Sequence, residues 1–292
     1  MSKKYRYVIL LFVLLIVAVT ACAEPGKQEG KSDSIARGYA KPLVRESDIH
    51  PAVDVDYQAI QKIDNMILYP DIVKKSLKVA AGQCMRNKGY IYSEKYFIPE
   101  NSSVRLSISP APLSVETARK HGYFANSENE RKENISFSGG EESAYYGAEE
   151  SSENGCMVDA LGAVFGDREI GLYYVTIINV ILPYANASLD AKEIEVLNEE
   201  WHQCMVTQKN MDYLSPPLAA LDADGRREKS QDIAIADAGC PEQVRYEERL
   251  TNNLNAYMTS FLNDNQALLE RVAQAKKNAE ANAPKLLDGS AS

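Results

Sequence analysis

The chain has 292 residues and a formal net charge of −9, from 41 acidic and 32 basic side chains. Its hydrophobic content of 45% is ordinary for a globular protein and is sufficient to fill a core. An acidic surface repels phosphate backbones, so we expect no nucleic-acid partner.

The N-terminus has the pattern of a bacterial lipoprotein signal. Three basic side chains precede an apolar stretch at 7–19, which is shorter than the roughly 20 residues of a membrane span. The letters Val-Thr-Ala-Cys at 19–22 then match a lipobox, in which cleavage before the cysteine is followed by attachment of diacylglycerol to its thiol. We therefore predict a signal peptide at 1–21, lipid attachment at Cys22, and a place on the outer face of the cell membrane. An ordinary signal peptide or an uncleaved anchor is the alternative.

The rest of the chain divides into three parts by composition. Residues 22–53 are polar, contain scattered proline and glycine, and lack periodicity, which predicts a flexible tether. Residues 54–280 show helical periodicity and are expected to form one extracytoplasmic domain with long loops. Residues 281–292 are expected to be a disordered tail.

Apolar residues at three- and four-residue spacing predict a mainly α fold. Helices are expected from about 57 to Pro70, from Asp71 to Gly89, at 114–123, at 156–166, at 188–205 with Ser188 as its cap, at about 227–239, and as one long helix after Pro241. The stretch 170–184 is ambiguous, because its β-branched residues favour a strand while its length and lack of alternation allow a buried helix. We favour the helix, since its neighbours are helical.

The acidic stretch 126–155 is predicted to be a surface loop with a short helical piece. Tyr145 and Tyr146 within it are the candidate contact surface. The chain has 17 tyrosines against 6 phenylalanines, and tyrosine combines apolar area with a polar tip that suits a half-solvated surface.

Four cysteines are left once Cys22 is assigned to the lipid: Cys84, Cys156, Cys204 and Cys240. An even number in an exported protein favours disulfides, although four cysteines permit three pairings. The phrase Gln-Cys-Met occurs twice, and each copy is followed by a polar loop and then a further cysteine. This repetition selects Cys84–Cys156 and Cys204–Cys240. No two cysteines have the short spacing of a zinc site or a redox motif, so we expect no metal.

The residues around the second phrase resemble a family. Trp201-x-x-Cys204-Met205 and Ala234-x-Ala236-Asp237-x-x-Cys240 are similar to motifs of uncharacterised secreted lipoproteins from Gram-positive bacteria. The resemblance covers about residues 73–270 and implies an exported, disulfide-stapled, helical lipoprotein without an assigned reaction. The second phrase lacks the glycine that follows Cys-Met in that group, which puts the turn after Met205 in doubt.

A search for catalytic motifs finds no zinc-protease, hydrolase, phosphate-loop or dinucleotide pattern, so we name no catalytic residue and no cofactor. Asp237 is read as a polar anchor in the core rather than a catalytic acid. We expect a non-catalytic binding or protein-interaction module, with an envelope protein as its partner. Two alternatives stay open: an envelope enzyme, a wall or peptide hydrolase using a carboxylate pair, and a solute-binding protein.

Overall fold

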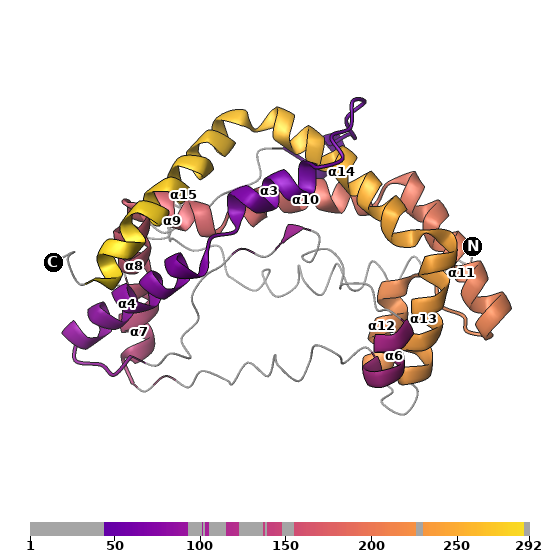
Figure 1. The fold of residues 1–292 in the computed structure, drawn as a ribbon, viewed down its shortest axis with the longest axis horizontal. Coiled ribbons are helices and arrows are strands. Elements are labelled where there is room, and N and C mark those ends of the chain that lie inside the picture. Colours follow the sequence, from indigo (N-terminus) through magenta and orange to yellow (C-terminus); the bar gives the residue numbers. More distant parts are fainter. Residues whose placement is uncertain are drawn as a thin grey trace, which may run out of the picture. The chain divides into compact units, whose positions relative to one another are not determined.

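The computed structural model describes residues 44–92, 101, 103–104, 115–122, 137, 139–147, 155–225 and 230–288. Every secondary-structure element in these ranges is a helix (Figure 1), which confirms the mainly α fold class. The elements are η1 Glu46–Asp48, α3 Ala59–Ile67, α4 Asp71–Asn87, α6 Val115–His121, α7 Glu141–Tyr146, α8 Cys156–Phe165, α9 Arg168–Val175, α10 Ile178–Leu189, α11 Lys192–Lys209, α12 Pro216–Gly225, α13 Ser230–Val244, α14 Tyr246–Asp264 and α15 Gln266–Leu287.

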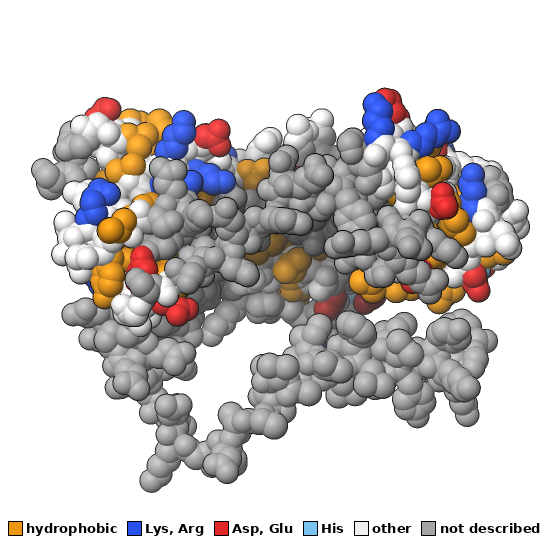
Figure 2. Space-filling model, turned by 90° about the horizontal axis from the view of Figure 1, so that it is seen from below, with side chains coloured by type: hydrophobic (Ala, Val, Ile, Leu, Met, Phe, Trp, Pro, Cys, Tyr) orange, Lys and Arg blue, Asp and Glu red, His pale blue; other side chains and the backbone are white. Residues whose placement is uncertain are grey.

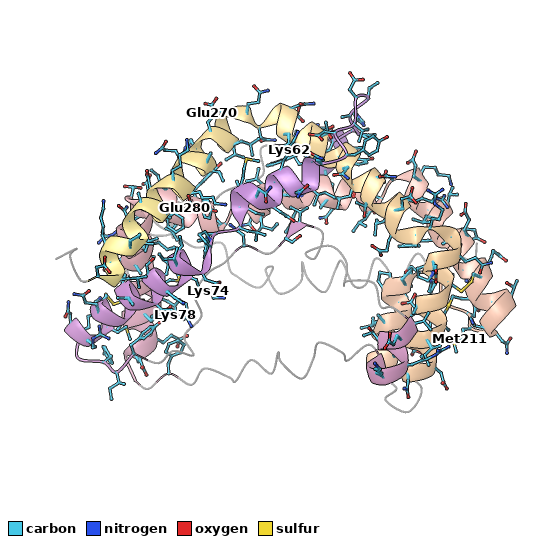
Figure 3. The ribbon with its side chains drawn as sticks, in the orientation of Figure 1. Lys62, Lys74, Lys78, Met211, Glu270 and Glu280 are labelled. Carbon is cyan, nitrogen blue, oxygen red and sulfur yellow. A yellow bond between two sulfur atoms is a disulfide. The ribbon has the colours of Figure 1, made fainter. Side chains whose placement is uncertain are left out.

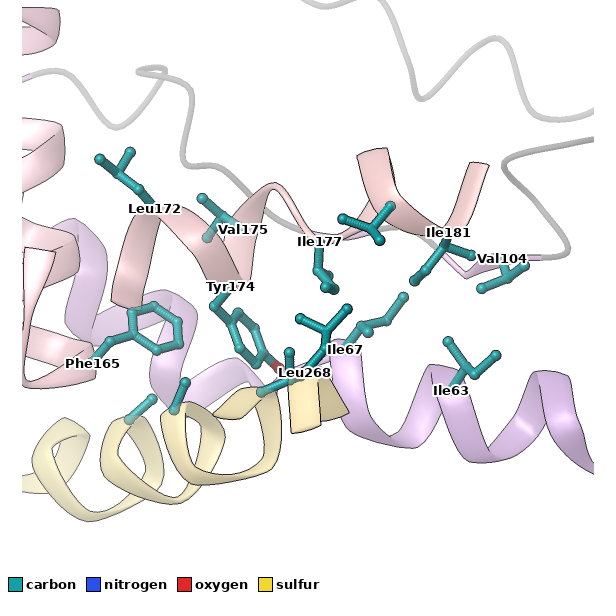
Figure 4. Packing of buried hydrophobic residues seen from close by; sticks show 14 of the residues in the cluster. Ile63, Ile67, Val104, Phe165, Leu172, Tyr174, Val175, Ile177, Ile181 and Leu268 are labelled. Carbon is teal, nitrogen blue, oxygen red and sulfur yellow. The ribbon is translucent and has the colours of Figure 1, made fainter. Parts of the chain in front are cut away.

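The larger of the hydrophobic cores joins α3, α4, α8, α9 and α10 to α15 and the second half of α14. Figure 4 shows Ile67 of α3 close to Tyr174, Ile177 and Leu268, whereas Ile63 of the same helix lies nearer Ile181 and Val104. The Tyr174 hydroxyl is buried with its ring and donates to the carbonyl of Met66 at 2.9 Å. The phenol therefore satisfies a carbonyl at the end of α3 while its ring fills the core.

The ambiguous stretch 170–184 is helical, but it belongs to two helices. α9 begins after Asp167, whose carboxylate caps the backbone N–H of Ile170 at 3.0 Å. It ends at Thr176, whose hydroxyl donates to the carbonyl of Leu172 at 2.7 Å, and α10 follows. By length and composition alone, 168–189 could cross a membrane, yet half of the apolar window is buried inside the domain. A core helix has these properties too.

A smaller core forms where α11, α12 and α13 meet the start of α14. The predicted apolar stripe of α11 is buried in it, with Ile194, Leu197, Trp201 and Met205 each 3% exposed or less. Helix α14 is shared by both cores. Its Tyr246 and Leu250 pack in the smaller core, and residues 254–261 pack in the larger one. One continuous helix thus connects the two.

Two predicted boundaries are wrong. The predicted tether does not reach residue 53, because Ile49 is buried, Ala52 N–H donates to Ala256 O at 3.1 Å, and Ser260 donates to the carbonyl of His50 at 2.7 Å. At the other end, α15 extends to Leu287, so 281–287 is helix rather than disordered tail. The first 43 residues and the last four lie outside the described residues.

Two helix ends also differ from expectation. Ser188 lies inside α10, where its hydroxyl donates to Ala185 O, and Ala191 precedes α11 instead. The long C-terminal helix is divided at Asn265, whose side-chain amide donates to Phe261 O at 2.9 Å. A side chain that occupies a helix carbonyl competes with the next turn, which explains the break.

Candidate functional site

The Cys204–Cys240 disulfide is one of two links between α11 and α13. The two Cα atoms are 5.8 Å apart. Three residues earlier on each helix, the indole Nε1–H of Trp201 donates to Asp237 Oδ1 at 3.1 Å. Because three residues make nearly one turn, the two links lie one above the other, and α11 and α13 run in the same direction here. Asp237 is therefore the polar anchor that the sequence indicated.

The Cys84–Cys156 disulfide connects helices in a different arrangement, with Cα atoms 5.5 Å apart. Cys84 lies near the end of α4, whereas Cys156 is the first residue of α8. One turn further along α8, the Asp159 carboxylate pairs with Arg168 at 2.6 Å. Both predicted disulfides are present, but the second cysteine stands at a helix start in one case and near a helix end in the other.

The two Gln-Cys-Met phrases end their helices in similar ways. Gly89 has φ +84°, and the next N–H, of Tyr90, donates to Met85 O at 2.9 Å. In the second copy Asn210 takes the left-handed conformation, with φ +54°, and Met211 N–H donates to Met205 O at 3.0 Å. Asparagine tolerates this conformation better than most non-glycine residues. The turn is thus retained without the glycine.

The two candidate contact residues, Tyr145 and Tyr146, differ in exposure. Tyr145 is fully buried in the larger core, so it is not a contact residue, whereas Tyr146 is 36% exposed. Gly155 explains the burial of Tyr145. A Cβ at Gly155 would stand 2.3 Å from the carbonyl oxygen of Tyr145, so only glycine lets α7 approach the start of α8 this closely. The two rings meet edge to face at 5.0 Å.

Helix α12 presents its large apolar side chains to solvent. Leu218 and Leu221 are 47% and 66% exposed and lie three residues apart on one face of α12, and Leu214, 55% exposed, lies just before the helix begins. The opposite positions, Ala219 and Ala223, are fully buried against α13. This reverses the usual amphipathic order, in which large apolar residues face the core. We call these three residues the leucine face. The three leucines can be seen in the sequence, but their spacing does not indicate whether the leucines or the alanines of α12 face the core.

A groove of about 410 Å³ lies between the start of α11 and α14. It is lined by Lys192, Glu193, Ile194, Val196, Leu197, Arg249, Asn252 and Asn253. The charged groups in it are largely occupied: Arg249 pairs with Glu200, and Lys192 pairs with Glu195 at 2.7 Å. Asn253 donates to Ser188 O at 2.7 Å. These contacts join α14 to α11 and to the end of α10, and they leave few polar side chains of the groove available to bind a ligand.

Glu46 and Asp190 are two acids whose charges interact across the domain surface. Desolvation, and next the Asp190 carboxylate, raise the pKa of Glu46. Both residues are exposed, and neither lines the groove at α11 and α14. The pair therefore lacks the enclosed cleft that the carboxylate pair of a hydrolase uses.

No group of three or more potential metal ligands occurs among the described residues. The Asp-Ala-Asp-Gly stretch at 222–225 is part of α12, and Asp222 accepts a hydrogen bond from the Tyr213 hydroxyl at 2.7 Å. The Nδ1–H of His202 donates a hydrogen bond to the carbonyl oxygen of Tyr213 at 2.8 Å. Cys22 lies outside the described residues.

Comparisons with protein-family models, with curated proteins and with solved structures find no match for this chain. The function is therefore inferred from the sequence and the geometry of this structure alone.

Proposed function

We propose that this protein is a lipoprotein held at the outer face of the cell membrane by Cys22, where it acts as a non-catalytic protein-interaction module. Two observations support the compartment. The lipobox sequence ends at Cys22, and the described domain contains two disulfides, which persist in oxidising surroundings outside the cytoplasm. A Gram-positive origin follows only from the resemblance to the lipoprotein group.

The leucine face of α12 carries the interaction part of the proposal. Monomeric proteins rarely leave adjacent large apolar residues on one helix face without a use, and such patches are typical of protein-protein contacts. The Cys204–Cys240 disulfide and the Trp201–Asp237 hydrogen bond fix α13, on which α12 packs. A partner would thus meet a preformed surface, which lowers the entropic cost of association.

The two alternatives have less support. A hydrolase needs two acids that converge in a cleft, and the exposed Glu46 and Asp190 do not provide one. A two-lobed solute-binding protein needs alternating strands and helices around its ligand, whereas the described ranges are helical.

Site-specific photo-crosslinking in the native bacterium tests the proposal. A photoreactive residue in place of Leu221 should capture a discrete envelope protein, and the same residue in place of the exposed Asp232 on α13 should not. The double variant Leu218→Ser/Leu221→Ser should lose the captured partner while keeping the helical circular dichroism of the parent. Equal crosslinking at both positions, or capture that survives the double variant, would contradict the interaction surface.

A further inference from the structure

The outer face of α4 differs in charge from the rest of the molecule. Its five exposed positions in the helix interior follow steps of three, four, four and three residues and so form one stripe. They are Ile72, Lys75, Val79, Gln83 and Arg86. We call this stripe the α4 outer face. It carries two cations and no acid, in a chain whose net charge is −9.

The stripe also displays apolar surface. Ile72 is 38% and Val79 is 39% exposed, and exposed Leu68 and Ile91 flank the helix at its two ends. Figure 2 shows orange apolar side chains on the surface of the molecule, with blue basic and red acidic side chains among them. At 1.5 Å per residue, the stripe extends for about 21 Å along α4. Two features therefore alternate along several helical turns: positive charge and exposed β-branched side chains.

The cations of the stripe are not used within the domain. Neither the Lys75 ammonium nor the Arg86 guanidinium has a hydrogen-bond or ion-pair partner in the described part of the chain. By contrast, Lys62 is paired with Asp56, and Lys276 donates to the carbonyls of Asn65 and Leu68. Lys74 and Lys78 are half-buried and project from one side of α4 (Figure 3), at least about 60° around the helix from the nearest residue of the stripe, so they are not part of it.

The exposed face of α11 is different in character. On α11, the outward positions include Glu193, Glu195, Glu199 and Glu200. Because mobile ions screen charges beyond about 8 Å at physiological salt, a nearby surface experiences the local charge of α4 more than the net charge of the chain.

We propose that the α4 outer face binds the anionic headgroup surface of the membrane. A soluble polyanion would engage only the cations, whereas the bilayer interface accepts basic side chains at the phosphates and apolar side chains just below them. The choice of a membrane rests on the proposed lipid anchor. Twenty-one residues lie between Cys22 and Val44, and that length of chain can reach about 70 Å when extended. The anchor can thus accommodate contact between α4 and the bilayer.

Vesicle binding tests this proposal without the anchor. All described helices and both disulfides lie within 44–288, so a protein of residues 23–292 keeps the complete described domain. Cosedimentation should show binding to vesicles of phosphatidylcholine with phosphatidylglycerol, little binding to phosphatidylcholine alone, and weakening by salt. Lys75→Gln/Arg86→Gln should weaken binding about tenfold or more. Ile72→Ser/Val79→Ser should also weaken it.

The charge-matched control is Lys209→Gln/Lys277→Gln, which removes two exposed lysines away from the stripe and should leave binding unchanged. Failure to bind anionic vesicles, equal loss in the control, or binding to soluble polyphosphate without binding to vesicles would each overturn the proposal. None of these results bears on acylation of Cys22, which labelled fatty acid and the Cys22→Ser variant report separately.

Discussion

The indole N–H of Trp201 donates to Asp237 Oδ1 at 3.1 Å, one helical turn before the disulfide that joins Cys204 to Cys240. The hydrogen bond and the disulfide therefore connect the same two helices at successive levels. This geometry gives a physical reason for the Trp-x-x-Cys and Asp-x-x-Cys spacings. Each three-residue interval places a polar link and a covalent link on the same face of its helix.

Removing the Asp237 carboxylate should destabilise the smaller core. In Asp237→Ala the buried indole N–H of Trp201 loses its acceptor, and we expect a loss of about 1–3 kcal/mol in the free energy of unfolding. Chemical denaturation would measure it. Asp232→Ala on the same helix removes an exposed acid and should change stability by no more than about 0.5 kcal/mol. If the two variants unfold alike, the Trp201–Asp237 contact does not stabilise the fold.

The two disulfides should contribute similar amounts to stability. They close loops with sequence separations of 72 and 36 residues, for which the chain-entropy model gives about 4 kcal/mol each, with about 0.6 kcal/mol more for the longer loop. Cys84→Ala/Cys156→Ala and Cys204→Ala/Cys240→Ala should each lower the denaturation midpoint strongly. A pair whose removal leaves the midpoint unchanged would show that its bridge is absent or strained in solution.

Two helical glycines offer an internal comparison. A Cβ at Gly171 would lie 2.8 Å from the Cβ and 3.0 Å from the carbonyl oxygen of Leu161, so α8 and α9 would have to separate in Gly171→Ala. We expect a loss of about 1–3 kcal/mol. Gly239 has no heavy atom within 4 Å of the same position, so Gly239→Ala should gain up to about 1 kcal/mol from helix propensity alone. Thermal unfolding of both variants checks the opposite signs, and destabilisation by both would contradict this packing.

Buried tyrosines predict loss of stability at high pH. Desolvation raises the pKa of Tyr145 and of Tyr174 well above the ordinary value of about 10. Above that pH the unfolded chain releases these protons while the folded chain retains them, so the free energy of unfolding falls. The slope is about 1.4 kcal/mol per pH unit for each tyrosine, and the stability is fully present below about pH 10. Tyrosinate absorbance should therefore rise in two phases, the second together with unfolding. A single phase without unfolding would count against the buried phenols.

Strong periodic patterns were sufficient to predict much of the fold. The stripe that contains Ile194, Leu197 and Trp201 is buried where its spacing indicated. The repeated Gln-Cys-Met phrase led to the correct cysteine pairing. These features depend on residues near one another in sequence, or on a phrase that occurs twice.

Features that depend on distant packing were missed. The end of α15 packs through Ala275, Ala279 and Ala283, all at most 2% exposed, and alanines at four-residue spacing form a weak apolar signal in sequence. Asn282 of the same helix donates to Val164 O at 3.1 Å at the end of α8, a contact that no local pattern reveals. Tyr145 is buried because Gly155 permits a close backbone approach. The α4 outer face was not predicted, because Val79 and Gln83 stand between its two cations.

Intact-mass analysis of the protein purified from a lipoprotein-processing bacterium, alkylated with and without reduction, tests the central claim most directly. The account predicts a chain that begins at Cys22, carries diacylglycerol on that residue, and takes up no alkylating reagent until reduction exposes four thiols. A chain that retains its first 21 residues with an unmodified Cys22, or one whose Cys84, Cys156, Cys204 or Cys240 reacts without reduction, would contradict it.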